Sequence, residues 1–223
     1  MILYIVRHGN TFGDDQEGGK RVFMAGCNQN IPLVASGRAQ ARAFAQYLEK
    51  VASHPTAIYA SHLLRTWEFA SIIREYFFNQ HKFEISLYRD ERLLELDYGD
   101  WAGLTTDGEH NEIIAKFGLD AWQAWQQQRV FHNFPPHNWR ITEIEVKNNI
   151  IGFTNDIIER YNDNDVVIAV GSQGSLYYFN ALLDAQMQNL QVTERLRIKT
   201  GNFCKLVYDT GYWRLIEWNT AVH

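Results

Sequence analysis

The residues best suited to chemistry lie in two polar segments that each follow a short apolar run. Arg7 and His8 follow residues 2–6, and Arg65 lies shortly after residues 57–60. Short apolar runs of this kind predict buried strands, and ligands of open α/β sheets bind at the carboxyl ends of strands. An arginine beside a histidine at such a place indicates an anion-binding site that also holds a nucleophile.

A third polar segment, later in the chain, carries carboxylates. The ordered stretches RHGNT (residues 7–11), SHLLRT (61–66) and ELDYGDWAGLT (95–105) resemble the RHGxT, SxLxRT and E-x-x-x-G-x-W-x-G-x-T segments of the histidine phosphatase superfamily, also called the phosphoglycerate mutase-like family. The stretch VVIAVGSQGS (166–175) is similar to the family's strand and turn that usually contain VSHGG. The resemblance covers most of the chain, and residues 104–145 match least.

The resemblance implies a catalytic role for each of four residues. His8 would attack phosphorus and hold the phosphoryl group covalently, as a neutral imidazole can. Arg7 and Arg65 would bind the equatorial phosphoryl oxygens through their planar guanidinium donors. Glu95 would protonate the leaving oxygen and later activate water.

Two other carboxylates, Glu91 and Asp97, are alternatives to Glu95. Counting back from Tyr98 in the family motif favours Glu95 as the acid and base. In-line phosphoryl transfer depends on positioning and fixed positive charge, and the resemblance implies neither a metal nor another cofactor. On the same resemblance, the candidate substrate-binding residues are Asn10, Asp14 and Gly174.

The main departure from the family is Gln173, which stands where the VSHGG segment carries a second histidine. Its amide can donate a hydrogen bond to phosphate but brings no charge. Loss of one preorganised transition-state donor costs a factor of about 10²–10³ in rate. We therefore expect a slow or specialised enzyme, or a relative that binds its ligand without turnover. Residues that could supply a replacement cation are His62, His132, His137 and Arg140.

Two functions of different kinds remain open. The favoured one is a phosphomonoester hydrolase that acts through a phosphohistidine on a small phosphorylated metabolite, because His8, both arginines and Glu95 are all present. The alternative is a catalytically impaired pseudophosphatase that binds a phosphorylated ligand or partner, and Gln173 supports it. A mutase is less favoured, because no long C-terminal tail follows the last predicted hairpin.

Alternating strand and helix patterns place these residues in one α/β domain. The predicted strands are residues 2–6, 57–60, 83–87, 165–170, 203–208 and 213–218. The predicted helices are residues 36–50, 63–77, 144–161 and 176–184, with Ser36 as an N-cap and a turn at 171–175. The pattern predicts a three-layer sandwich with a mainly parallel central sheet, helices on both faces and a terminal antiparallel hairpin.

The segment between the third and fourth strands contains no convincing strand pattern. Residues 104–145 are predicted to form a helical cap inserted into a single domain of residues 1–223. Six aromatic residues lie within residues 117–139. We expect most of these rings to close a small core of their own and a few to line a pocket for a partly apolar leaving group.

Composition excludes several other classes of protein. The chain has 223 residues and a net charge of −5, which argues against a nucleic-acid partner. Cys27 and Cys204 match no zinc-ligand spacing, and no run approaches the ~18 apolar residues of a membrane span. The N-terminus lacks the features of a signal peptide. These features predict a cytoplasmic protein with no membrane partner, and a homodimer is left open.

Overall fold

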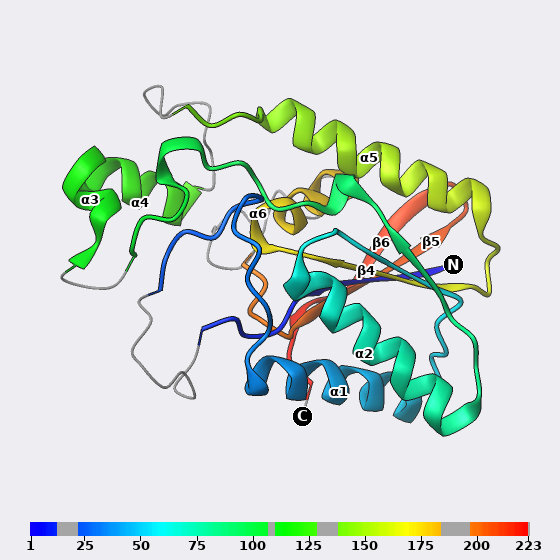
Figure 1. Cartoon of the computed structure of the whole chain (residues 1–223). Coiled ribbons are helices and arrows are strands. Elements are labelled where there is room, and N and C mark those ends of the chain that lie inside the picture. Colours follow the sequence, from blue (N-terminus) through cyan, green and yellow to red (C-terminus); the bar gives the residue numbers. More distant parts are fainter. Residues whose placement is uncertain (13–21, 107–109, 129–137, 184–196, 223) are drawn as a thin grey trace.

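The computed structural model describes residues 1–12, 22–106, 110–128, 138–183 and 197–222. One sheet of six strands lies at its centre, in the order β3-β2-β4-β1-β5-β6 (Figure 1). The strands are β1 (Ile2–Arg7), β2 (Ala57–Ala60), β3 (Ser86–Arg89), β4 (Val166–Gly171), β5 (Phe203–Asp209) and β6 (Tyr212–Thr220). The first four are parallel, whereas β5 pairs antiparallel with both β1 and β6. The predicted fold class is confirmed.

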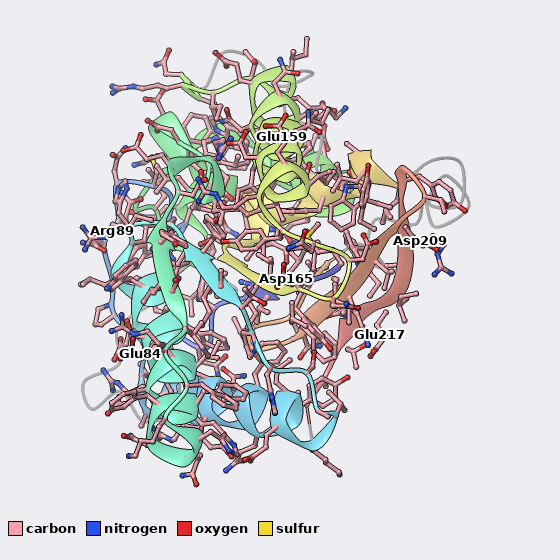
Figure 2. The ribbon with its side chains drawn as sticks, turned by 90° about the vertical axis from the view of Figure 1, so that its right-hand side faces the viewer. Glu84, Arg89, Glu159, Asp165, Asp209 and Glu217 are labelled. Atoms are coloured by element: carbon pink, nitrogen blue, oxygen red, sulfur yellow. The ribbon has the colours of Figure 1, made fainter. Side chains whose placement is uncertain are left out.

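Helices cover both faces of this sheet. Helices α1 (Ala35–Lys50) and α2 (Leu64–His81) pack on one face, and α5 (Glu143–Arg160) packs on the other. Figure 2 shows the same layers from the side, with Glu159 of α5 on one side of the sheet and Glu217 of β6 near its edge. The alternation along β1 explains the two cores, because Leu3 and Ile5 enter one hydrophobic cluster and Tyr4 and Val6 enter the other.

Several predicted element boundaries were wrong. The strand predicted at 83–87 is Ser86–Arg89, because this edge strand pairs only with the four residues of β2. The turn predicted at 171–175 is not present as such. Strand β4 ends at Gly171, and the short helix α6 (Gln173–Leu176) begins two residues later. The helix predicted at 176–184 is a 3-10 helix, η4 (Tyr177–Leu182), within the described part of the chain.

The predicted N-cap role of Ser36 was also wrong. Helix α1 begins at Ala35 after an extended Val34, and no side chain caps it. The Ser36 hydroxyl instead accepts a hydrogen bond from Asn10 Nδ2 at 3.3 Å. By contrast, α5 begins with a capping box in which Thr142 and Glu145 exchange hydrogen bonds.

Helices α3 (Glu112–Phe117) and α4 (Leu119–Gln128) lie at one end of the sheet (Figure 1). Their rings do not close a core of their own, because Trp125 and the partly buried Phe117 and Trp122 belong to the same cluster as α5. Trp101 is fully buried and contacts the rings of Phe117 and Trp122 at centroid distances of 5.9 and 6.4 Å. The cap boundaries stay a prediction, and Phe131 and Phe134 lie outside the described residues.

Among the described residues, no helix combines the length and the apolar character that crossing a membrane requires.

The loop after β1 approaches the first turn of α1 through two glycines. A Cβ at Gly9 would overlap the backbone of Gly37, and a Cβ at Gly37 would overlap the backbone of Asn10. The Asn10 carbonyl also accepts a hydrogen bond from Val34 N at 3.0 Å. Glycine at both positions therefore lets the helix support the loop that carries His8.

Replacement of Gly37 by alanine tests this close approach. Because the new methyl group would meet backbone atoms, we expect Gly37→Ala to lower the free energy of unfolding by about 1–3 kcal/mol, measured by urea denaturation. The matched control is Gly152→Ala inside α5, where the nearest atom to a Cβ is Arg92 Nη1 at 3.7 Å. That change should stabilise the protein by about 0.5–1 kcal/mol. A neutral Gly37→Ala would contradict the packing described.

Candidate active site

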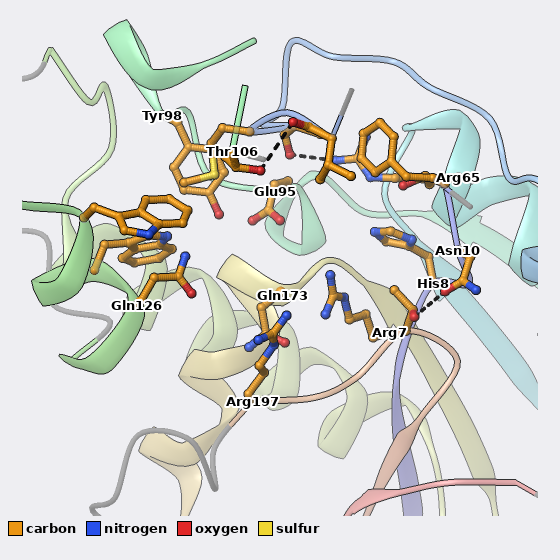
Figure 3. A pocket seen from close by; sticks show the side chains of 18 residues that line it. Arg7, His8, Asn10, Arg65, Glu95, Tyr98, Thr106, Gln126, Gln173 and Arg197 are labelled. Carbon is orange, nitrogen blue, oxygen red and sulfur yellow. Dashed lines mark hydrogen bonds between the residues drawn. The ribbon is translucent and has the colours of Figure 1, made fainter. Parts of the chain in front are cut away.

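The carboxyl ends of β1, β2 and β4 surround a pocket of about 240 Å³. Figure 3 shows the labelled side chains around it. The sequence-predicted residues that line this pocket are Arg7, His8, Asn10, Arg65, Glu95 and Gln173. The structure thus brings together residues from four separate parts of the chain, and the role of each remains a prediction.

His8 is held as a neutral imidazole at the end of β1. Its side chain is 5% exposed, and Nδ1 lies 2.7 Å from the Gly9 carbonyl oxygen. A carbonyl oxygen only accepts, so Nδ1 carries the proton and the Nε2 lone pair is available. Burial, and then the positive charges of Arg65 and Arg7, hold the pKa of His8 well below its usual 6.5. Such a group is a nucleophile at neutral pH.

Arg65 is a buried cation held by main-chain oxygens. It lies at the start of α2, is 1% exposed, and donates from Nη1 to the Gln29 carbonyl at 2.7 Å. Nη2 donates to the Gly26 carbonyl at 3.3 Å, and Nε donates to Ser172 Oγ at 3.4 Å. Burial lowers the pKa of Arg65 from its usual value, yet a guanidinium stays protonated in proteins. These bonds fix the direction of a positive charge beside His8.

Arg7 is fixed from the other side of the pocket. Its Nη1 donates to the Ile198 carbonyl at 2.9 Å, and its backbone N–H donates to Asn202 O at 3.1 Å. The next backbone N–H, that of His8, donates to Gly171 O at 3.1 Å. The loop is therefore held between the end of β4 and the segment before β5.

Among the three candidate carboxylates, Glu95 alone lines the pocket. It is 7% exposed, and its oxygens accept from Leu96 N at 2.9 Å and from Gly174 N at 3.4 Å. Glu91 is exposed on η1 (Glu91–Leu93), and Asp97 Oδ1 accepts from Gly99 N at 3.0 Å. Glu95 is therefore the carboxylate that can exchange a proton with a ligand in this pocket.

Gly174 lies behind Glu95 and does not line the pocket. A Cβ at this position would overlap Glu95 Oε1, with Leu96 Cγ and Tyr98 Oη both at 2.7 Å. The prediction that Gly174 contacts substrate is not supported by this placement. Its N–H instead donates to the Glu95 carboxylate, and its lack of a side chain leaves space for that carboxylate.

Gln173, the first residue of α6, is 8% exposed. Its Oε1 accepts a hydrogen bond from Ile198 N at 3.0 Å. Its buried Nε2 has no hydrogen-bond partner within the described part of the chain. A buried unpaired donor is costly, and an anion oxygen in the pocket is a suitable acceptor for it.

The other predicted residues divide into three groups. Asn10 lines the pocket, with its amide bonded to Ser36 and to Thr200 Oγ1. His62 and Arg140 are exposed and do not line this pocket. The residues that lie outside the described part of the chain are Asp14, His132 and His137.

Several residues that line the pocket were not predicted from the sequence. Arg197 and Thr200 line the pocket from the segment before β5. The sequence held a signal for these two residues. A strand that pairs antiparallel with β1 begins at the edge of the sheet where β1 ends, so the residues before it lie near the site. Figure 3 shows Tyr98, Thr106 and Gln126 on the side of the pocket away from His8, and Trp122 and Trp125 also line the pocket.

The burial of neutral His8 predicts a pH effect on stability. Below pH 6.5, His8 is protonated in the unfolded chain but stays neutral in the folded chain, because burial lowers its pKa there. The free energy of unfolding should therefore fall as pH drops from 6.5 towards the folded pKa, by up to about 1.4 kcal/mol per pH unit.

The same ring can be titrated directly by NMR in a buffer without phosphate, with its signal assigned by its loss in His8→Ala. We expect a midpoint well below 6.5 because of burial and the two arginines. A midpoint at or above 6.5 would contradict the electrostatics described.

Comparisons with known proteins agree with this geometry. The model of the histidine phosphatase superfamily (branch 1) matches residues 3–221. A comparison with curated protein sequences gave no significant match. YhfR of Bacillus stearothermophilus is similar in structure, with a TM-score of 0.74, 26% identity, and coverage of 99% of this chain and 97% of that one.

Two structures with lower identity share the fold. A mycobacterial glucosyl-3-phosphoglycerate phosphatase has a TM-score of 0.76 and 24% identity, with 99% of each chain covered. The alpha-ribazole phosphatase of Shigella flexneri has a TM-score of 0.70 and 19% identity, covering 100% of this chain and 98% of that one. The resemblance in the sequence motifs is confirmed by the family match: the chain belongs to the histidine phosphatase superfamily, branch 1.

Proposed function

We propose that this protein hydrolyses phosphomonoesters of a small metabolite through a phosphohistidine at His8. The observation that carries the proposal is a neutral buried imidazole with its Nε2 lone pair available, beside two guanidinium groups and a carboxylate in one pocket. Family membership supports a phosphatase. The structurally similar phosphatases named above support a small phosphorylated metabolite as substrate.

The proposed reaction has two steps. His8 Nε2 attacks phosphorus while the bond to the leaving oxygen breaks and Glu95 donates a proton to that oxygen. Water then attacks the phosphohistidine, Glu95 accepts a proton from the water, and the N–P bond breaks to release inorganic phosphate. Arg7 and Arg65 neutralise the phosphoryl oxygens in both steps, and the Gln173 amide donates one uncharged hydrogen bond.

The leaving group faces the wall built by α4 and the segment around Tyr98. Trp122 and Trp125 give this wall an apolar part, and Gln126 and Thr106 give it polar groups. The wall suits a leaving group that is partly apolar and carries hydroxyl or amide groups.

Hydrolysis of an aryl phosphate and of a panel of small phosphomonoesters tests the function. We expect turnover by the wild type, no detectable turnover by His8→Ala, and a loss of about 10²–10⁴ in kcat for Glu95→Gln because a general acid is removed. An acid-labile phosphoenzyme should form in the wild type and be absent in His8→Ala. His62→Ala is the matched control and should keep the wild-type rate, because His62 is exposed and outside the pocket.

The second candidate function, a pseudophosphatase that binds a phosphorylated ligand, rests on Gln173. It predicts no turnover and no phosphoenzyme in the wild type, and gain of turnover in Gln173→His. Wild-type turnover that Gln173→His slows would exclude it and would make Gln173 part of a working site.

A further inference from the structure

Arg197 is a third guanidinium at the pocket, and no family motif in the sequence pointed to it. It lies in the segment before β5, and its side chain lines the pocket that His8 and Gln173 also line. Ile198, the residue after Arg197, is bonded to Gln173, and Figure 3 shows Arg197 and Gln173 in the lower part of the view, away from Arg65. A guanidinium therefore lines the same pocket as Gln173, which stands where the family motif carries a histidine.

The backbone beside Arg197 is held firmly by the site itself. Ile198 is fully buried, its N–H donates to Gln173 Oε1 at 3.0 Å, and its carbonyl accepts from Arg7 Nη1 at 2.9 Å. Gly201 N lies 3.2 Å from the carbonyl oxygens of both Arg7 and His8. These bonds tie the segment that follows Arg197 to the loop that carries His8.

The chemistry of the side chain fits a phosphoryl group. A guanidinium is charged at every accessible pH and presents five N–H donors in a planar fork that matches phosphate oxygens. Gln173 contributes only an uncharged amide. Within the described part of the chain, the pocket is lined by Arg7, Arg65 and Arg197, and Arg197 directly precedes Ile198, whose N–H is bonded to Gln173 Oε1.

We propose that Arg197 binds the phosphoryl oxygens on the Gln173 side of the pocket, and that Gln173 positions it through the hydrogen bond to Ile198. The effect of Arg197 on turnover rests on the proposed function. The effect of Arg197 on anion binding is independent of the proposed function. The rival role for Arg197 is to bind an anionic group on the leaving part of the substrate.

Binding of inorganic phosphate, measured by calorimetry, separates these roles because phosphate has no leaving group. Arg197→Ala should weaken binding about 10- to 100-fold, as expected for loss of a charged hydrogen bond, and Arg197→Lys should lie between it and the wild type. Arg140→Ala is the matched control and should bind as the wild type does. Wild-type affinity in Arg197→Ala would overturn the proposal. Phosphate binding needs no turnover, so this result is independent of whether the protein hydrolyses any ester.

Steady-state kinetics give a second readout. Arg197→Ala should lower kcat about 10²-fold on an aryl phosphate with an uncharged leaving group, with partial recovery in Arg197→Lys. An unchanged kcat and kcat/KM on that substrate would overturn a role at the phosphoryl group.

The positioning role of Gln173 is tested by a double-mutant cycle on phosphate affinity. Gln173→Ala should weaken binding more in the wild type than in Arg197→Ala, because part of its effect acts through Arg197. Strictly additive losses would overturn the positioning role while leaving direct binding by Arg197 intact. Thermal unfolding of each variant checks that all remain folded.

Discussion

The pairing of β1 with β4 on one side and β5 on the other is the constraint on which the site depends. In this register Arg7 lies opposite Gly171, and Val6 lies opposite both Val170 and Phe203. The parallel neighbour therefore brings α6 and Gln173 to the end of β1, and the antiparallel neighbour brings the segment with Arg197 to the same place. A shift of this register by one residue would turn every side chain of β1 to the other face.

Electrostatics at this edge of the sheet favour an anion. Arg65 is desolvated and bonded mainly to neutral carbonyl oxygens, and the neighbouring carboxylate, Glu95, is itself bonded to backbone N–H groups. Burial, and then the positive charges of Arg65 and Arg7, lower the pKa of His8 and keep it neutral. An oxyanion in the pocket would gain from the same arginine charges that, after burial, keep the imidazole unprotonated.

Aromatic residues connect the charged residues of the pocket to the hydrophobic core. Tyr98 contacts Trp125 at a centroid distance of 5.7 Å and Trp139 at 5.0 Å, and Tyr98 and Trp125 also line the pocket. The same rings thus pack α4 against the body of the protein and line the pocket. A change in their packing would therefore change the shape of the pocket.

The sequence by itself determined the fold class and predicted the set His8, Arg7, Arg65, Glu95 and Gln173, because these depend on local patterns and short motifs. The tertiary structure decided that these residues line one pocket, and that Gly174 lies behind the Glu95 carboxylate and outside that lining. It also decided that Arg197 lines this pocket, whereas His62 and Arg140 do not. The physical reason is that each of these facts depends on which segments, far apart in the sequence, meet at the edge of the sheet. No local sequence pattern encodes which segments meet.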